Sequence, residues 1–454
     1  MSLHSLKSLH TLEHGTPVHV AGWVRTTRQS RSILFIEIHD GSQFATTQCV
    51  IDADHSQYSV ISKLTIGSSV RIHGQLKTGL TGKHKHEIAI DTIIVEGMAD
   101  SDYPLQKKRH SFEFLRTIPH LRPRSNTFYA VFKTRSILTQ GMHKYLESQD
   151  VTYIQAPAIT TTDAEGGGDV FRISTLDPTQ PHQDFKDDIF KQEAFLNVTG
   201  QIHIEPFIQA FQRVYTFGPS FRAEKSNTSR HVSEFWQVEP ELAYVDLVGL
   251  MDFIESMSNA MIQYVLDHAS EELAFFDEFI EKGLIKKLQH TVSEPYGRIS
   301  YSQAIQLLVD TDHAFTVNPT WETGLQSEHE HYLTDVIFKK PVFVTDYPKD
   351  QKAFYMKLND DQVTVAATDL LFPKIGEIVG ASERETRLDV LQERIKAHDL
   401  DEQLYTWYLD TRRYGTVEHS GFGLGIERFM RYITGMDNIR DVIPYPRTPG
   451  SADF

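Results

Sequence analysis

The sequence contains a single cysteine, Cys49, among 454 residues. An internal disulfide framework is therefore excluded, and a reducing compartment, by default the cytoplasm, is expected. Long uncharged apolar runs are absent, and the first residues lack the charged-then-apolar pattern of a secretory signal. We therefore expect a chain that neither spans nor crosses a membrane. Its hydrophobic content of 40% is enough for the cores of two or three domains.

Positive charge is also in short supply. Lysine and arginine number 45 against 61 aspartates and glutamates, which gives a formal net charge of -16. This balance argues against a protein that coats nucleic acid through bulk electrostatics, because phosphate binding needs clustered cations. A local basic cluster is nevertheless present at residues 107–110 and continues through Arg116, Arg122 and Arg124. It is compatible with a nucleic-acid contact or with an ordinary solvated surface.

The most informative stretch is a polar segment at residues 221–241. Apolar residues at 214–217 and 242–244 flank a loop rich in Ser, Asn and Thr, a pattern that predicts two strands joined by a long hairpin. Arg222 leaves the first strand, and its planar guanidinium can hold a phosphate or a carboxylate through two parallel hydrogen bonds. Phe235 offers an aromatic face to a base. The segment indicates a nucleotide site, with a charged surface hairpin as the alternative.

A second motif, GFGLGIER at residues 421–428, places a glycine at every second position. Alternating glycines leave one face of a strand bare, so that a flat ring can approach the backbone closely. Arg428, at the start of the helix expected next, can reach a terminal phosphate. Glycine within a strand can also mark a simple bulge. The pairing with the segment at 221–241 favours one ligand that both arginines face.

Together these motifs resemble motifs two and three of the class II aminoacyl-tRNA synthetases, and the resemblance runs almost end to end. Within that class the sequence is most similar to the asparaginyl-tRNA synthetases. The similarity rests on further segments, which are DAEG at 163–166, EFW at 234–236, DYPK at 346–349, KAFYM at 352–356, GEIVG at 376–380 and PYPRTP at 444–449. It implies an ATP-dependent, AMP-forming ligase that joins L-asparagine to tRNA(Asn).

The resemblance also implies where ATP binds. Arg222 would contact both the α-phosphate and the carboxylate of the amino acid, and Phe235 would stack on adenine. His231 and Arg428 would hold the outer phosphates. The whole expected ATP site is Arg222, Glu224, Arg230, His231, Phe235, Glu377, Gly423, Gly425 and Arg428, and the expected catalytic residues within it are Arg222, Glu377 and Arg428.

A magnesium ion is expected beside the phosphates. Mg²⁺ takes hard oxygen ligands and usually bridges phosphates through few protein carboxylates. By the resemblance, Asp369 and Glu377 would meet the metal. As isolated acids, both residues would otherwise be read as surface charge.

Selection of asparagine over aspartate is a hydrogen-bond problem, because an amide presents a donor and an acceptor whereas a carboxylate presents two acceptors. By the resemblance, Glu239 would accept from the amide nitrogen and Arg384 would donate to the side-chain oxygen. Glu165 and Gln201 would bind the ammonium group. Related aspartyl enzymes carry a lysine three residues after this glutamine, where the present chain has Ile204. Without that lysine, a substrate carboxylate lacks a positive partner, which favours asparagine.

Residues 17–99 are expected to form a small barrel. The predicted strands lie at 18–24, 33–38, 46–51, 69–74 and 86–90. With a hairpin turn at Asp40-Gly41 and a short helix at 58–64, they fit the five-stranded Greek-key OB-fold. OB-folds stack bases on exposed aromatics and read base edges with polar groups. The expected anticodon-binding residues are Arg25, Phe35, Gln48 and Glu87, with barrel core as the alternative for Phe35.

The rest of the chain is expected to form one α+β domain. A helix at 128–148 and a strand at 151–157 resemble motif one, which implies a homodimer. Further helices are predicted at 248–288 and 388–412, and further strands at 341–346, 363–370 and 376–380. The expected fold is therefore an OB-fold anticodon-binding domain at 1–101, a hinge linker at 102–124 and a class II catalytic domain, an antiparallel sheet flanked by helices, at 125–454.

Three other functions remain open at this point. The first is a compact aspartyl-tRNA synthetase, including one that charges both tRNAs. The second is a catalytically silent paralogue that binds RNA or protein, against which the intact Arg222, Glu377 and Arg428 argue. The third is a tRNA-independent asparagine synthetase, which would need no barrel. The chain also departs from the asparaginyl pattern, with GQIHIE at 200–205 in place of GQLNGE and Lys225 in place of Asn, which affects the pocket wall and the loop.

Overall fold

The structure is a computed structural model that describes residues 2–79, 86–162, 164, 169–180 and 184–454. The contacts divide the chain into two compact units, Met1–Ala130 and Val131–Phe454. The finer boundaries at residues 101 and 124 stay a prediction.

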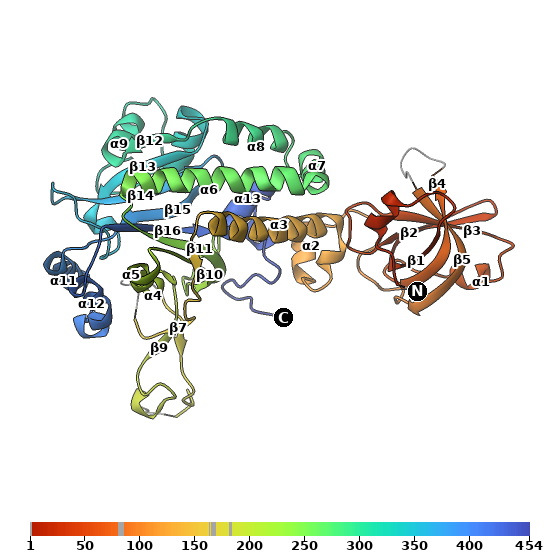
Figure 1. Cartoon of the computed structure of the whole chain (residues 1–454), viewed down its shortest axis with the longest axis horizontal. Coiled ribbons are helices and arrows are strands. Elements are labelled where there is room, and N and C mark those ends of the chain that lie inside the picture. Colours follow the sequence, from red (N-terminus) through yellow and green to blue (C-terminus); the bar gives the residue numbers. More distant parts are fainter. Residues whose placement is uncertain (1, 80–85, 163, 165–168, 181–183) are drawn as a thin grey trace. The chain divides into compact units, whose positions relative to one another are not determined.

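The first unit contains a closed five-stranded barrel in the order β1-β2-β3-β5-β4, which confirms the expected fold of this region (Figure 1). The strands are β1 (Pro17–Ser30), β2 (Ile33–His39), β3 (Thr47–Asp52), β4 (Ser69–Thr78) and β5 (His86–Gly97). Along β2 the buried residues Leu34, Ile36 and Ile38 alternate with partly exposed ones. Phe35 therefore points away from the barrel core, so the core alternative for this residue is wrong.

The connection between β2 and β3 differs from the expected tight turn at Asp40-Gly41. β2 ends at His39 and β3 begins at Thr47, so a longer loop joins them. The Asp40 carboxylate accepts hydrogen bonds from the backbone N–H groups of Leu6 and Ser42, at 2.8 and 2.9 Å. Asp40 therefore ties this loop to the N-terminal segment instead of forming a two-residue hairpin.

The basic segment between the barrel strands and the body also differs from a solvated linker. It contains α2 (Phe112–Thr117) and a short 3₁₀ turn, Arg122–Arg124. The side chain of Arg122 is fully buried, and its guanidinium lies 4.3 Å from the centre of the Phe128 ring. This cation therefore has a structural contact, and the solvated-surface reading does not hold for Arg122.

The second unit is built on a sheet in the order β12-β13-β14-β15-β16-β11-β10-β6. The strands are β6 (Thr152–Tyr153), β10 (Arg213–Phe221), β11 (Glu234–Ala243), β12 (Gly297–Ser300), β13 (Val342–Pro348), β14 (Thr364–Phe372), β15 (Gly376–Glu383) and β16 (His419–Gly425). The predicted hairpin of β10 and β11 and the glycine-rich strand β16 are confirmed. The sheet is antiparallel in its centre, but β12–β13 and β6–β10 are parallel pairs at its two edges. A second, small sheet was not expected from the sequence. It consists of β7 (Ile159–Thr160), β9 (Ala194–Leu196) and β8 (Arg172–Ile173).

Helices flank this sheet, as expected for the class. They are α3 (Asn126–Ser148), α4 (Gln201–Ile204), α5 (Ile208–Phe211), α6 (Leu247–His268), α7 (Ser270–Phe279), α8 (Leu284–Ser293), α9 (Tyr301–Val309), α10 (Ser327–His331), α11 (Leu388–Ala397), α12 (Thr406–Arg413) and α13 (Ile426–Thr434), while the barrel carries α1 (Tyr58–Ile61). Asp246 caps α6 by accepting from the N–H of Gly249. The face of α6 that packs across β14, β15 and β16 is apolar and fully buried, and it consists of Leu250, Ile254, Met257, Met261 and Val265.

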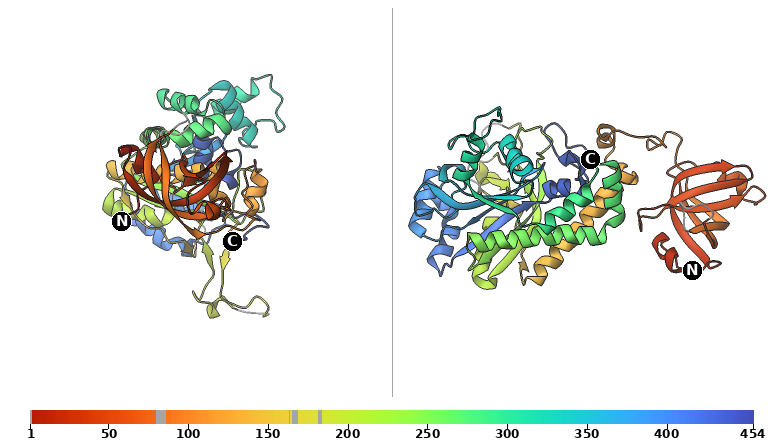
Figure 2. Two further views of the ribbon diagram at one scale, coloured as in Figure 1. Left: turned by 90° about the vertical axis from the view of Figure 1, so that its right-hand side faces the viewer. Right: turned by 90° about the horizontal axis from the view of Figure 1, so that it is seen from above.

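The long helices α3 and α6 lie side by side in the views of Figures 1 and 2. Hydrogen bonds of 2.8 Å join Lys144 Nζ to Tyr264 OH and Tyr145 OH to Ser256 Oγ. Gly141 allows the close approach, since a Cβ there would lie 2.6 Å from the Tyr264 ring. This pair of helices supports one side of the sheet, and the opposite side carries the candidate site.

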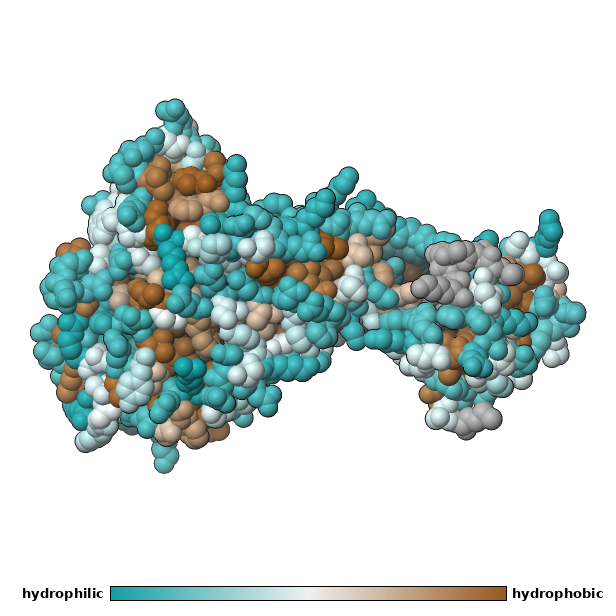
Figure 3. Space-filling model, turned by 45° about the horizontal axis from the view of Figure 1, so that its top comes forward, coloured by the Kyte–Doolittle hydropathy of each residue, from teal (hydrophilic) through white to brown (hydrophobic). Residues whose placement is uncertain are grey.

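On the face shown in Figure 3, hydrophobic residues form separate patches within a mainly hydrophilic surface. Among the described residues, no helix combines the length and the apolar character needed to cross a membrane.

Candidate active site

A cavity of about 550 Å³ opens on the sheet of the second unit. Residues from α4, β11, β14, β15, β16, α13, the loop between β10 and β11, and the segment at 350–356 line it. It contains all the expected ATP, substrate and metal residues that the structure describes, namely Gln201, Arg222, Glu224, Arg230, His231, Phe235, Glu239, Asp369, Glu377, Arg384, Gly423, Gly425 and Arg428. Glu165 lies outside the described residues. Segments more than two hundred residues apart in the sequence therefore meet in one site.

Strand periodicity explains how β11 contributes to this cavity. Gln237, Glu239 and Glu241 occupy alternate positions and share one face, while Val238 between them is fully buried on the other. The glycines of β16 lie opposite this row, with Gln237 paired to Gly425 and Glu241 paired to Gly421. The bare strand face expected from the sequence is therefore present.

The three glycines have different uses, however. Gly423 and Gly425 line the cavity. At Gly421 a Cβ would lie within 2.5 Å of the Glu241 carboxylate, so this glycine makes room for a protein side chain and not for a ligand. The interpretation of the motif as a platform for a flat ring applies only to Gly423 and Gly425.

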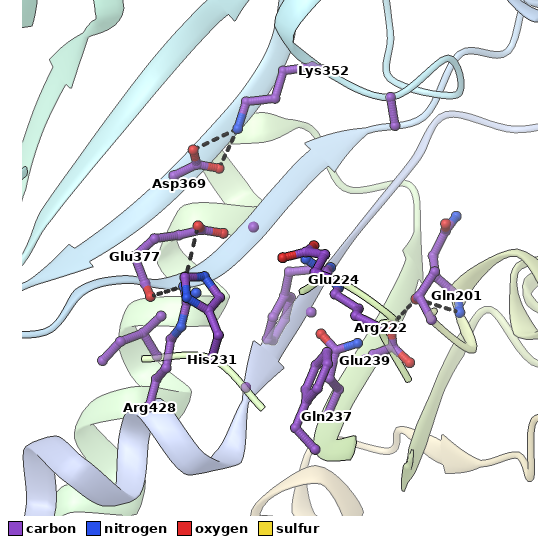
Figure 4. Close-up of a pocket in the computed structure, with 18 of the residues that line it drawn as sticks. Gln201, Arg222, Glu224, His231, Gln237, Glu239, Lys352, Asp369, Glu377 and Arg428 are labelled. Atoms are coloured by element: carbon purple, nitrogen blue, oxygen red, sulfur yellow. Dashed lines mark hydrogen bonds and ion pairs between the residues drawn. The ribbon is translucent and has the colours of Figure 1, made fainter. Parts of the chain in front are cut away.

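One end of the cavity gathers charged groups of both signs (Figure 4). The Lys352 ammonium donates to both oxygens of Asp369, at 2.6 and 2.7 Å. Arg428 donates from Nη1 to the backbone oxygen of Glu377 at 2.8 Å and lies 3.4 Å from its carboxylate. Two cations and two carboxylates thus lie where sequence reasoning placed the phosphates.

The charged groups at this end of the cavity shift one another's pKa values. Burial alone would raise the pKa of Glu377. The charges of Arg428 and Lys352 outweigh burial, so the pKa of Glu377 is lowered. Burial raises the pKa of Asp369, with Lys352 opposing this shift and Glu377 adding to it. Burial and the charge of Arg428 lower the pKa of His231, so its imidazole is neutral at neutral pH.

Arg230 is held at the rim of the same end. Its Nη2 donates to the backbone oxygen of Ile375 and lies 3.5 Å from a carboxylate oxygen of Glu330. Gly376 has a φ of +79°, and a Cβ there would collide with the Arg230 guanidinium at 2.2 Å. The glycine is therefore required both by backbone conformation and by the approach of this arginine.

The other end of the cavity is formed by Gln201 and Glu239. Both side chains are buried. Glu239 accepts hydrogen bonds from the Thr199 hydroxyl and from the backbone N–H of Gly200, the latter at 2.9 Å. In Figure 4, Arg222 lies between this end and the group around Glu377. This location suits a cation that contacts two reacting groups at once.

Arg384 lines the cavity as predicted, but much of its guanidinium is already engaged. Nε donates to Glu241 at 3.1 Å, Nη2 donates to the other oxygen of the same carboxylate, and Nη1 donates to Ser382 Oγ at 2.8 Å. Burial raises the pKa of the Glu241 carboxyl, and Arg384 opposes that shift. A guanidinium has five N–H donors, so Arg384 retains donors for a ligand.

Sequence reasoning missed several residues of this site. Lys352 and Tyr355 lie in the segment KAFYM, which carried the resemblance but received no role. Glu241 was quoted within the polar segment without a function, and Thr199 and Gln237 were not singled out. The sequence did contain an indication for Lys352. It lies in the KAFYM motif, close in the chain to the predicted strands at 363–370 and 376–380, and a lysine there is a candidate partner for their acidic residues.

On the barrel, three of the four expected anticodon residues share one face. Phe35 of β2 pairs with Val50, and in the next row Gln48 of β3 pairs with Glu87 of β5. Gln48 donates to the Glu87 carboxylate at 3.0 Å. Arg28, which sequence reasoning did not select, lies 4.7 Å from the centre of the Phe35 ring. Arg28 therefore adds a cation to this face.

Arg25 is placed differently. The register of β1 and β2 shifts between Val24 and Thr26, so Arg25 sits at an irregularity of the strand. Its guanidinium donates to the side chain of Asn126 at 2.7 Å. Arg25 is thus engaged within the protein, in contrast to Phe35.

Comparison with known families agrees with this architecture. A family profile described as tRNA synthetases class II (D, K and N) matches residues 112–449. A second profile, described as an OB-fold nucleic acid binding domain, matches residues 18–96. The matched regions correspond to the sheet that carries the cavity and to the barrel.

Individual relatives narrow the family further. The asparagine–tRNA ligase of Clostridium beijerinckii is 51% identical over 441 residues, 96% of this chain and 95% of the relative. The solved asparaginyl-tRNA synthetase of Pyrococcus horikoshii, in complex with asparaginyl-adenylate, is 32% identical with a TM-score of 0.89, over 99% of each chain. The corresponding complex from Entamoeba histolytica is 26% identical with a TM-score of 0.84, over 98% of each chain. The chain therefore belongs to the asparaginyl-tRNA synthetases of class II, a family of ATP-dependent ligases.

Proposed function

We propose that the cavity activates L-asparagine with ATP and transfers it to tRNA(Asn). The amino-acid carboxylate attacks the α-phosphate, which forms asparaginyl-adenylate and releases pyrophosphate. A ribose hydroxyl at the 3′ end of the tRNA then displaces AMP. The observation that carries this proposal is the convergence of the predicted arginines, acids and glycines on one cavity.

Phosphoryl transfer of this kind depends mainly on positioning and on neutralising charge. Arg222 is the group we assign to the α-phosphate and the substrate carboxylate, because it lies between the two ends of the cavity. Arg428 and His231 are assigned to the outer phosphates, with Arg230 and Glu224 at the rim. Phe235 is assigned to adenine, with Gly423 and Gly425 leaving space beside it.

We assign the amino acid to the end formed by Gln201, Glu239 and Arg384. A carboxylate has about four acceptor positions, so Glu239 can accept from the substrate amide in addition to the Thr199 hydroxyl and the Gly200 N–H. Arg384 would donate to the side-chain oxygen. Aspartate would instead bring a carboxylate towards Glu239, and sites that read hydrogen-bond polarity in this way discriminate by roughly 10⁴-fold or more.

Pyrophosphate exchange tests this assignment, with asparagine, aspartate or no amino acid added. Exchange with asparagine alone is the expected result. Exchange with aspartate at a similar kcat/KM would shift the function to an aspartyl or dual-specificity enzyme and would contradict the role of Glu239. Absence of exchange with both asparagine and aspartate would indicate a silent paralogue.

The residues of the acidic end fit a magnesium ion. A Cβ at Gly380 would lie 3.5 Å from Glu377 Oε1 and 3.9 Å from Asp369 Oδ1, so the two carboxylates border one point above β15. Burial raises the pKa of Asp369 and the charge of Glu377 adds to that shift, so a further cation beside the two carboxylates would stabilise their ionised forms. Among the described residues no group of three or more His, Cys, Asp or Glu forms a metal cluster by itself. Bound between these acids and the phosphates, Mg²⁺ would neutralise phosphate charge.

Removing Mg²⁺ with a chelator is expected to abolish exchange. Glu377→Gln is expected to raise the Mg²⁺ concentration for half-maximal exchange by about 10-fold or more, because one anionic ligand is lost. The measurement is a Mg²⁺ titration of exchange at saturating ATP and asparagine. Glu393→Gln, an exposed change on α11, serves as the control. An unchanged titration in the Glu377 variant would remove this residue from the metal site.

We assign the anticodon to the barrel face that carries Phe35, Gln48 and Glu87, with Arg25 beside it at the strand irregularity. Phe35→Ala is expected to raise KM for tRNA(Asn) about 10-fold, since stacking of a base on an aromatic side chain is worth roughly 1–3 kcal/mol. Pyrophosphate exchange, which needs no tRNA, should not change. Val60→Ala, an exposed apolar change on α1, is the matched control. Equal tRNA kinetics in both variants would contradict the assignment of Phe35.

A homodimer and a cytoplasmic location complete the proposal. The edge strand β6 leaves Tyr153 about half exposed, at 48%, and an exposed strand edge is commonly covered by a partner. Light scattering coupled to size-exclusion chromatography would give the oligomeric state, and a monomeric mass would contradict the dimer. The single cysteine, Cys49, is free and buried, as suits a reducing compartment.

A further inference from the structure

A buried carboxylate lies directly behind the amino-acid end of the cavity. Glu205 is 1% exposed and receives four donors that come from α4, α12 and β16. Gln201 Nε2 and Arg412 Nη2 each lie 2.5 Å from it, Tyr408 OH lies 2.7 Å away, and His419 Nε2 lies 2.9 Å away. None of these contacts was assigned a role in the proposed reaction.

The Glu205 carboxyl is ionised. Burial favours the neutral acid, but the charge of Arg412 and the hydrogen bond from His419 outweigh burial, and the pKa of Glu205 is lowered. An ionised carboxylate only accepts hydrogen bonds. The side of the Gln201 amide that faces Glu205 must therefore be the NH₂ group, which fixes the orientation of the amide.

This orientation leaves the carbonyl oxygen of Gln201 facing elsewhere. Oε1 is buried and has no hydrogen-bond partner among the described residues, and Gln201 lines the cavity. A buried acceptor without a donor is costly, so such an atom indicates a missing donor. The ammonium group of an amino acid supplies three N–H donors and the positive charge that an amide oxygen prefers.

The partners of Glu205 are themselves held in place. Arg412 Nε donates to the backbone oxygen of Glu385 at 2.9 Å, and His419 Nδ1 lies 2.7 Å from the backbone oxygen of Val417. Tyr408 OH accepts from Arg412 at 3.0 Å while donating to Glu205. Glu205 therefore has little freedom to move away from Gln201 or to turn.

We propose that Glu205 is a positioning residue for asparagine binding: it holds the Gln201 amide so that Oε1 faces the substrate ammonium. The inference rests on the proposed role of Gln201 in the amino-acid pocket. Arg412, Tyr408 and His419 act through Glu205 and touch no substrate. The network is thus part of amino-acid binding in the first step and not only of the core.

Glu205→Gln tests the proposal. A glutamine at 205 offers both a donor and an acceptor, so the Gln201 amide is free to reverse. We expect KM for asparagine in pyrophosphate exchange to rise about 10-fold or more, the scale of a lost hydrogen bond to a charged group. KM for ATP should stay within twofold, because none of the four donors to Glu205 is among the expected ATP residues. A general structural defect would change both constants, so equal increases would overturn the proposal.

A double-mutant cycle with Gln201→Ala separates positioning from an independent effect. If Glu205 acts through Gln201, the double variant has the same KM for asparagine as Gln201→Ala alone. Additive increases would overturn the proposal. Gln209→Ala is the control. It removes a nearby glutamine of α5 whose side-chain amide donates to the backbone oxygen of Thr411.

Failure of the inference and failure of the underlying assignment give different results. If Gln201→Ala raises KM for asparagine and Glu205→Gln does not, only the positioning role fails. If Gln201→Ala leaves KM unchanged, the assignment of Gln201 fails as well.

A second variant is available if Glu205→Gln does not fold. Tyr408→Phe removes one donor to Glu205 and no charge. It is expected to raise KM for asparagine about threefold, with no further effect in the Gln201→Ala background, and an unchanged KM would overturn the proposal.

Discussion

Replacing Arg222 with alanine is expected to reduce asparagine-dependent pyrophosphate exchange by about 10³-fold or more. Arginines that stabilise charge during phosphoryl transfer contribute on this scale. Arg222 follows β10 directly and lies between the acidic end and the amino-acid end of the cavity. Because it would contact the α-phosphate and the attacking carboxylate together, kcat should fall more than either KM rises.

Arg222→Lys distinguishes geometry from charge. Lysine keeps the positive charge but lacks the planar pair of donors, so exchange should remain about 10²-fold below the original protein. Arg213→Ala, at the opposite end of the same strand and outside the cavity, should leave exchange within twofold. Thermal unfolding of all three variants checks the fold. Exchange within threefold of normal in Arg222→Ala would rule out its assigned role.

The sequence contained enough information to predict that the expected ATP residues line one cavity. Arg222, His231 and Arg428 stand in short motifs whose residues are close in the chain, and strand periodicity places Gln237 and Glu239 on one face. The barrel was predictable for the same reason, since alternation along β2 separates Phe35 from the core. These predictions depend only on residues that are close in the sequence, so they need no information about contacts between distant segments.

The buried ion pairs could not be predicted in the same way. Arg384 and Glu241 are 143 positions apart, and Glu205 and His419 are 214 positions apart. Each residue alone has the sequence signature of a surface charge. Arg384 meets Glu241 because β11, β16 and β15 are neighbours in the sheet, whereas Glu205 reaches His419 from the turn that follows α4. Neither arrangement is visible in the periodicity. The sequence could not separate Gly421 from Gly423 and Gly425 for the same reason, because the Glu241 side chain that fills the space at Gly421 comes from another strand.

The Arg384 pair should show the largest effect on stability. Arg384→Met leaves the Glu241 carboxylate buried without its partner, and breaking such a pair costs about 3–5 kcal/mol of unfolding free energy. Arg71 and Glu96 form an ion pair on the barrel with both side chains over 40% exposed. Arg71→Met should therefore cost at most about 1 kcal/mol. Urea unfolding of both variants measures the difference.

Activity and stability should separate when both partners are replaced. In Arg384→Met/Glu241→Leu no buried charge is left unpaired, so most of the lost stability should return. Asparagine activation should stay at least about 10²-fold below normal, since the donor to the substrate side chain is still missing. Recovery of activation together with stability would show that Arg384 has a structural role only.

The pH dependence of Arg384→Met gives an independent check. Burial raises the pKa of Glu241 even with Arg384 present, and without that cation the carboxyl should be still harder to ionise. A buried acid with a raised pKa destabilises the fold when the pH lies above its unfolded value, near 4.3, and this cost disappears as the group is protonated. The stability gap between Arg384→Met and the original protein should therefore narrow as the pH falls from 8 to 5. A gap that stays constant over this range would mean that Glu241 does not carry the cost of the lost pair.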